Sequence, residues 1–164
     1  MSEREESGPR KIIGDWWARE IGDRQSSPAR ALAARLRRAT PVEALSEPAV
    51  HRLAARLNTR DPERLHRVVT VLVRLREDGR KSLPRKLGEQ RQPGAPYLRF
   101  QRLLRAEGEA LTTALIRALP MVNNACDVGA LGADLFFWND ATRVRWSFDY
   151  FGATAPESLE ETSE

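Results

Sequence analysis

At 164 residues, with 41% hydrophobic residues and a formal net charge of +4, the chain suits one compact domain or two small helical lobes sharing a core, which excludes wholesale disorder. No apolar run approaches the roughly 20 residues that cross a bilayer, and the acidic start does not resemble a signal peptide, so we expect a cytoplasmic protein without a membrane partner. The single cysteine, Cys126, excludes an internal disulfide and a multi-thiolate zinc site, and we expect it to be buried rather than nucleophilic.

Residues 11–77 are predicted to form an N-terminal helical lobe after a flexible acidic tail, residues 1–10. The first helix carries an aromatic anchor at helical spacing: Ile12, Ile13, Trp16 and Trp17. Capping residues then precede prolines at the start of each further helix: Ser27 before Pro28, Thr40 before Pro41, Ser46 ahead of Glu47 and Pro48, and Asp61 before Pro62. The valine-rich run of residues 68–73 is predicted to be helical because it lies inside a longer helical pattern with a good cap.

Residues 78–96 change in character, with three prolines, three glycines and five cations among few apolar residues. This composition predicts a basic linker or mobile loop between two lobes. Two interpretations remain open and do not exclude each other. The segment is either a tether or a flexible arm that contacts phosphates.

A C-terminal helical lobe is predicted over residues 97–152, followed by a flexible acidic tail, residues 153–164. Its first helix has an apolar face formed by Tyr97, Phe100, Leu103 and Leu104. Three arginines of that helix recur every three residues, so each is offset from the last by about 60°: Arg99, Arg102 and Arg105. A second helix is expected from about Glu109 to Leu119, and Asp127 can cap a third.

The stretch from Gly129 to Gly152 holds two of the four tryptophans and four of the five phenylalanines. Asp140 is a plausible N-cap in its middle, which predicts a helical hairpin. The last helix is apolar on two sides, as in a helix that lies between other elements. Trp146 and Tyr150 are therefore either core residues or, beside Arg143, part of a partner surface.

The acidic residues are concentrated at the chain ends, which hides a basic middle. Three glutamates against one arginine in residues 1–6 and four glutamates in residues 157–164 leave residues 7–156 at +10, six above the whole chain. Only three of the 27 basic residues are lysine. Guanidinium is planar, binds phosphate through two bonds and stacks on bases, so this preference suits nucleic acid, although a G+C-rich genome also favours arginine.

Residues for catalysis are scarce. His51 and His66 are the only histidines and lie in arginine-rich helices, where a partly exposed polar position is expected. No metal-binding motif, phosphate loop or nucleophile motif is present, and no strand pattern precedes the GALGAD segment at 129–134, so its glycines indicate close helix packing. We expect no cofactor, no metal and no small-molecule substrate. The basic residues expected to line a phosphate-tracking groove are Arg37, Arg38, Arg99, Arg102, Arg105 and Arg143.

Four segments in order resemble the CasB family, the small subunit of the type I-E CRISPR surveillance complex, Cascade: DWW at 15–17, RALAARLRRA at 30–39, YLRFQRLLRAE at 97–107 and DLFFWNDATRVRWSFDYF at 134–151. The resemblance covers about residues 11–152 and implies an all-α protein of two packed helical lobes. It further implies a non-catalytic Cascade subunit, usually in two copies beside the backbone and large subunits, that binds guide RNA and target DNA and stabilises the R-loop. The implied nucleic-acid contacts are Arg37, Arg38, Arg99, Arg102, Arg105, Arg117 and Arg143.

Two other functions stay open from the residues alone. A free-standing helical DNA-binding regulator has the same basic helices but binds one operator far more tightly than random DNA. An enzyme has almost no support in the sequence.

Overall fold

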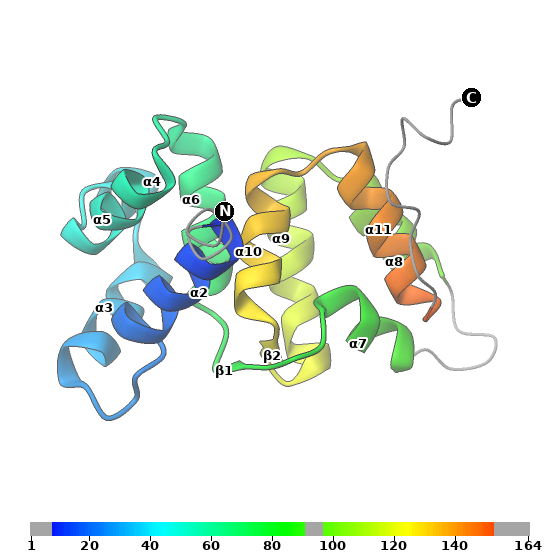
Figure 1. The fold of residues 1–164 in the computed structure, drawn as a ribbon, viewed down its shortest axis with the longest axis horizontal. Coiled ribbons are helices and arrows are strands. Elements are labelled where there is room, and N and C mark those ends of the chain that lie inside the picture. Colours follow the sequence, from blue (N-terminus) through cyan, green and yellow to red (C-terminus); the bar gives the residue numbers. More distant parts are fainter. Residues whose placement is uncertain (1–7, 91–96, 153–164) are drawn as a thin grey trace.

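The computed structural model describes residues 8–90 and 97–152, which are helical almost throughout, as predicted (Figure 1). The first half contains the helices α2 (Pro9–Glu20), α3 (Ser27–Arg38), α4 (Pro41–Leu45), α5 (Pro48–Leu57) and α6 (Pro62–Leu72). The second half contains α7 (Leu83–Glu89), α8 (Leu98–Arg105), α9 (Gly108–Ala118), the 3₁₀ turn η1 (Leu119–Val122), α10 (Val128–Phe136) and α11 (Asp140–Tyr150). Two two-residue strands, β1 (Glu77–Asp78) and β2 (Ala125–Cys126), pair in parallel between the halves.

Three of the six predicted caps are confirmed. Thr40 forms a capping box with Glu43. The side chains of Asp61 and Asp127 each accept a hydrogen bond from the backbone amide three residues further on. The valine-rich run lies in α6 and in the turn that ends it, so its helical prediction is confirmed.

Three predicted caps differ from the structure. Ser26, not Ser27, caps α3, because its hydroxyl accepts from the Ala29 amide at 3.2 Å. Asn139, not Asp140, caps α11, because Asn139 keeps an extended backbone and Asp140 is already helical. The hydroxyl of Ser46 donates to the Val42 carbonyl instead of capping α5, whose start has no side-chain cap bond.

The hydrophobic core runs through both halves without a break. α10 lies at the centre of the molecule and packs against α2 and α6 of the first half (Figure 1). The Trp16 indole donates to the Ala49 carbonyl at 2.8 Å and the Trp17 indole to the Leu72 carbonyl at 2.9 Å, and both rings are buried. The aromatic anchor predicted for the first helix therefore joins α2 to α5 and α6, and α2 begins at Pro9, within the predicted tail.

Glycines allow α2 and α10 to approach closely. A Cβ atom on Gly129 of α10 would meet the carbonyl oxygen of Arg10, whereas one on Gly14 of α2 would make ordinary contacts with Gly129 at 3.8 Å. The expectation that the GALGAD glycines serve helix packing is confirmed.

The segment predicted as a linker is folded over much of its length. Residues 83–89 form α7, which starts with the Ser82 hydroxyl as its cap and packs against α11. A Cβ atom on Gly88 would meet the Tyr150 carbonyl oxygen, so the two helix backbones touch. The loop prediction was wrong here because a good cap and tertiary contacts outweigh the proline, glycine and charge content. Residues 91–96 and the tails predicted over 1–7 and 153–164 lie outside the described residues.

A charged pair joins α2 to α5. Glu20, whose side chain is only 15% exposed, accepts two bonds of 3.0 Å from the Arg52 guanidinium. The hydrogen bond from Arg52 and its charge hold the pKa of the Glu20 carboxyl below its ordinary value, against the opposing effect of burial.

We predict that this pair makes stability depend on acidity. Because the folded-state pKa of Glu20 is lowered, its stabilisation is present above the ordinary carboxyl pKa and is lost as pH falls through the folded value. Glu20→Gln should lower the unfolding free energy by about 1 kcal/mol at pH 7 and change it little at low pH. Urea denaturation at both pH values measures this, with the exposed Glu77→Gln as the control, and an equal loss at both pH values would contradict it.

Candidate nucleic-acid interface

The three arginines of α8 lie on a helix whose opposite face packs against the core. Phe100 and Leu103 are buried in the core and Leu104 packs against it, so the arginine positions of this short helix face outward. Arg99, Arg102 and Arg105 are exposed, and none of them makes a salt bridge or a side-chain hydrogen bond with a described residue. Three guanidiniums within about 120° of one helix, none of them in an ion pair with a described carboxylate, form a surface that attracts phosphate.

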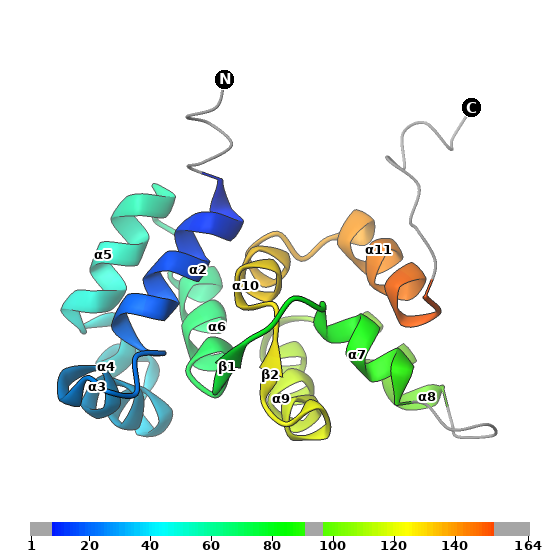
Figure 2. The ribbon, with the colours of Figure 1, turned by 60° about the horizontal axis from the view of Figure 1, so that its bottom comes forward.

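The other predicted arginines lie elsewhere. Arg37 and Arg38 end α3, and Arg117 lies in the last turn of α9; all three are exposed and unpaired among the described residues. Figures 1 and 2 place α3 and α8 at opposite ends of the long axis. The predicted residues therefore form separate groups along the molecule, and a groove that joins them stays a prediction.

Arg143 has a different environment from the rest. Its Nε donates to the Leu104 carbonyl at 2.8 Å, and its terminal nitrogens pair with Asp140 at 3.0 Å and Glu107 at 3.1 Å. The guanidinium also lies 5.5 Å from the centre of the Trp138 ring. These contacts use its hydrogen-bonding groups to attach α11 to the end of α8. Arg143 therefore stabilises the position of α8 instead of being presented to a ligand.

A groove of about 460 Å³ lies beside this attachment, and its lining mixes both charges with apolar surface. The residues around it are Tyr97, Gln101, Leu104, Arg105, Glu107, Asp140 and Arg143. The Tyr97 ring packs against Phe100, Tyr150 and Phe151, with centroids 5.3 to 6.0 Å apart. It therefore belongs to an aromatic cluster and is not presented singly to a base.

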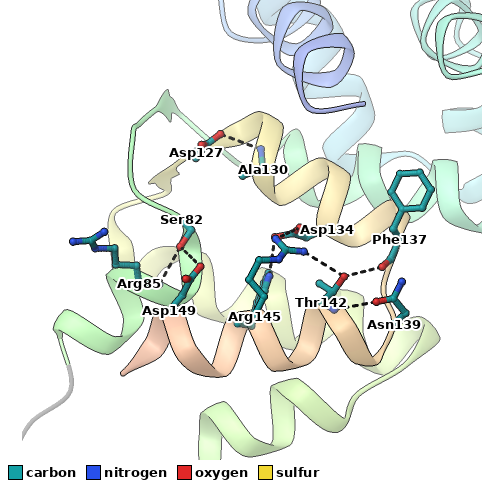
Figure 3. A network of polar contacts seen from close by, with 11 residues as sticks. Ser82, Arg85, Asp127, Ala130, Asp134, Phe137, Asn139, Thr142, Arg145 and Asp149 are labelled. Carbon is teal, nitrogen blue, oxygen red and sulfur yellow. Dashed lines mark hydrogen bonds and ion pairs between the residues drawn. The ribbon is translucent and has the colours of Figure 1, made fainter. Parts of the chain in front are cut away.

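The ambiguous aromatic residues of α11 belong to the core. Trp146 is fully buried, and Tyr150 stacks on Phe100 with ring centroids 4.1 Å apart. The Trp146 indole donates to Asp134 Oδ2 at 2.8 Å, and Arg145 donates to Asp134 Oδ1 at 2.8 Å (Figure 3). Asp134 is itself buried, so α10 presents one carboxylate that orients two side chains of α11.

We predict that Asp134→Asn lowers the unfolding free energy by about 2 kcal/mol, because an amide leaves one of the two donors facing an NH₂ group. The matched control is Asp149→Asn, since Asp149 accepts from the Ser82 hydroxyl at 3.1 Å and a hydroxyl can reverse its role. Its cost should stay below about 1 kcal/mol. Denaturation followed by circular dichroism compares the two, and equal costs would argue against the Asp134 contacts (Figure 3).

Groups with reactive chemistry occupy unreactive positions. Cys126 is buried, and this burial raises the pKa of its thiol to about 12. His51 is exposed on α5, whereas His66 is half-buried on α6 and shares a 3.1 Å hydrogen bond with Thr70. Burial lowers the pKa of His66, against the opposing charge of Glu109. Within residues 8–90 and 97–152, no three His, Cys, Asp or Glu side chains come together as a metal site would require.

One arginine was not singled out from the sequence. Arg74 follows α6 and lies between buried Val73 and Leu75, and its Nε is the one buried side-chain nitrogen or oxygen without a hydrogen-bond partner among the described residues. Its position inside an apolar run could have indicated a functional arginine, because arginine is rarely buried unless it is paired.

The described residues define an arginine-rich helical protein whose exposed cations, rather than a pocket of reactive groups, are its distinctive surface feature. A sequence profile described as CRISPR-associated protein Cse2 matches residues 33–151, well over half of the chain. The chain therefore belongs to the Cse2 family, the CasB small subunits of type I-E Cascade, and the resemblance found in its sequence is confirmed. The Cse2 family is a structural, non-catalytic component of Cascade, so this chain is a Cascade subunit.

Searches among curated proteins and among solved structures gave no match. No helix in the described part of the chain has the length and apolar content that crossing a membrane demands.

Proposed function

We propose that this Cascade subunit binds guide RNA and target DNA without sequence specificity and stabilises the R-loop, without catalysing a reaction itself. The observation that carries the proposal is a set of exposed arginines on α8 and in the last turns of α3 and α9, which have no partner within residues 8–90 and 97–152. Backbone phosphates are the ligand that such a surface attracts irrespective of sequence. In an R-loop, base pairing reads the target and protein holds the strands by charge and shape.

Arginines spread along the long axis, on α3, α9 and α8, suit an extended ligand better than a compact one. A nucleic-acid strand carries a phosphate at every nucleotide, so it can contact separate cations at both ends of one protein. We propose two copies of the chain per complex, beside the backbone and large subunits, which would lengthen this basic surface further.

Reconstitution of Cascade with and without this subunit tests the proposal. The subunit should enter the complex in two copies by native mass spectrometry, and its omission should shorten the lifetime of the R-loop. The isolated chain should bind unrelated oligonucleotides with similar affinity, and the affinity should fall steeply with salt. A footprint on a single operator, with affinity at least ~10³ above random DNA, would instead indicate a free-standing regulator.

A further inference from the structure

The segment that joins α6 to β1 holds Arg74 on a rigid base. The Arg74 amide donates to the Val71 carbonyl at 3.1 Å, and the Arg76 amide donates to the Asn124 carbonyl at 2.7 Å. The side chains on either side, Val73 and Leu75, are buried in the core. The start of the Arg74 side chain is therefore fixed, two residues after the end of α6.

The guanidinium of Arg74 has no partner in the described protein. Its Nε is buried without a hydrogen bond, and its two terminal nitrogens make none with any described residue. The residue as a whole is half-buried, and the terminal nitrogens are not among the buried unpaired atoms, so they reach solvent. The N–H groups of the two terminal nitrogens, held in a planar guanidinium, are thus available to an acceptor from outside.

The charged residue that acts on Arg74 is another cation, Arg37. Arg37 ends α3, which packs against α6, and it is exposed and unpaired among the described residues. Burial, and then the charge of Arg37, lower the pKa of Arg74, and no carboxylate acts in the opposite direction. Two cations close together, one of them partly desolvated, repel each other until an anion lies between them.

We infer that Arg37 and Arg74 together form a phosphate-binding site at the junction of α3 and α6. Guanidinium forks match the oxygens of a phosphate in geometry and charge, and two of them can hold one group from two sides. The inference rests on the proposed function for the source of that group, which is a nucleotide of the bound strand. Free inorganic phosphate shares this chemistry, so it serves as a separate probe.

The first experiment measures thermal unfolding of the full chain in sodium phosphate and in sodium chloride at equal ionic strength. Phosphate should raise the Tm of the wild type above its value in chloride, because a ligand of the folded state stabilises it. Arg37→Met and Arg74→Met should each show a clearly smaller difference, although not zero because phosphate also stabilises folded proteins in general. Arg56→Met, at an arginine of α5 that is exposed and unpaired among the described residues, should keep the full difference. In chloride, Arg74→Met should unfold no earlier than the wild type, because it removes an unpaired buried group.

The second experiment measures binding of a fluorescent single-stranded oligonucleotide of mixed sequence. Each single variant should raise Kd about 10-fold, and the double variant should raise it far less than the product of the two, because both residues hold the same phosphate. Arg74→Lys should recover only part of the affinity, since lysine keeps the charge without the fork.

The outcomes separate the site from the proposed function. If the wild type binds no oligonucleotide, the proposed function is wrong. The comparison of Tm in phosphate and in chloride still tests whether Arg37 and Arg74 bind phosphate. Equal losses in Arg56→Met, or fully multiplicative losses in the double variant, would overturn the shared site. Stabilisation by glutamate salts as strong as that by phosphate would assign the pair to a carboxylate instead.

Discussion

Gly129→Ala is expected to lower the unfolding free energy by about 3 kcal/mol, whereas Gly14→Ala, on the facing helix, should leave it unchanged or raise it by up to about 1 kcal/mol. The same methyl group is added on both sides of one helix crossing. At Gly129 it meets the backbone carbonyl oxygen of Arg10, which cannot move aside as a flexible side chain can. At Gly14 its nearest neighbours are 3.8 and 3.9 Å away, which is ordinary contact distance.

The opposite signs make this pair of variants a test of the α2–α10 packing itself. Alanine is the better helix former at both positions, so a purely local effect would stabilise both variants. For a chain of 164 residues, a loss of about 3 kcal/mol corresponds to a fall in Tm of roughly 6–12 °C. Thermal and urea denaturation of both variants measure the difference, and a Gly129→Ala variant as stable as the wild type would show that these helices can move apart at little cost.

Local signals explain why most of the fold was predictable. A capping side chain followed by proline acts within one helical turn, so the starts of α4 and α6 are visible in the sequence. The start of α7 has the same form, Ser82 before Leu83 and Pro84. It was missed because the segment was judged by its composition, although the contact between Gly88 and the Tyr150 carbonyl is what retains this helix.

The candidate site was less predictable, because the pairing of charges depends on contacts between distant residues. Glu20 pairs with Arg52, 32 residues away, and Glu107 pairs with Arg143, 36 residues away. Helical projection places an arginine on a face but does not show whether a carboxylate from another element reaches it. The sequence therefore grouped Arg143 with the α8 arginines, and only the fold distinguishes the paired residue from the unpaired ones.

The same limit applies to the aromatic residues of α11. A helix that is apolar on two sides can lie inside a core or present one side to a partner. Asp134, 12 residues before Trp146, resolves the alternatives because its buried carboxylate binds the indole. A buried acceptor on a neighbouring helix leaves no sign in helical periodicity.

Replacing Arg99, Arg102 and Arg105 together by glutamine is expected to weaken binding to mixed-sequence nucleic acid by about 100-fold or more at low salt, with the fold intact. All three side chains are exposed and unpaired among the described residues, so their loss breaks no contact that holds α8. If each neutralises one phosphate, the slope of log K against log salt should fall by about 2.1 for a single strand and about 2.7 for a duplex. Glutamate in place of glutamine should deepen the loss by adding repulsion.

The control for this triple variant removes the same charge elsewhere. Arg24, Arg56 and Arg60 are also exposed and unpaired among the described residues, and they lie in the half of the chain that does not contain α8. Replacing those three by glutamine should cost clearly less affinity if α8 is the contact surface, and equal losses would indicate attraction to net charge alone. In assembled Cascade, the α8 variant should shorten R-loop lifetime without preventing incorporation of the subunit. An R-loop of normal lifetime with the α8 variant would exclude this helix from the nucleic-acid interface.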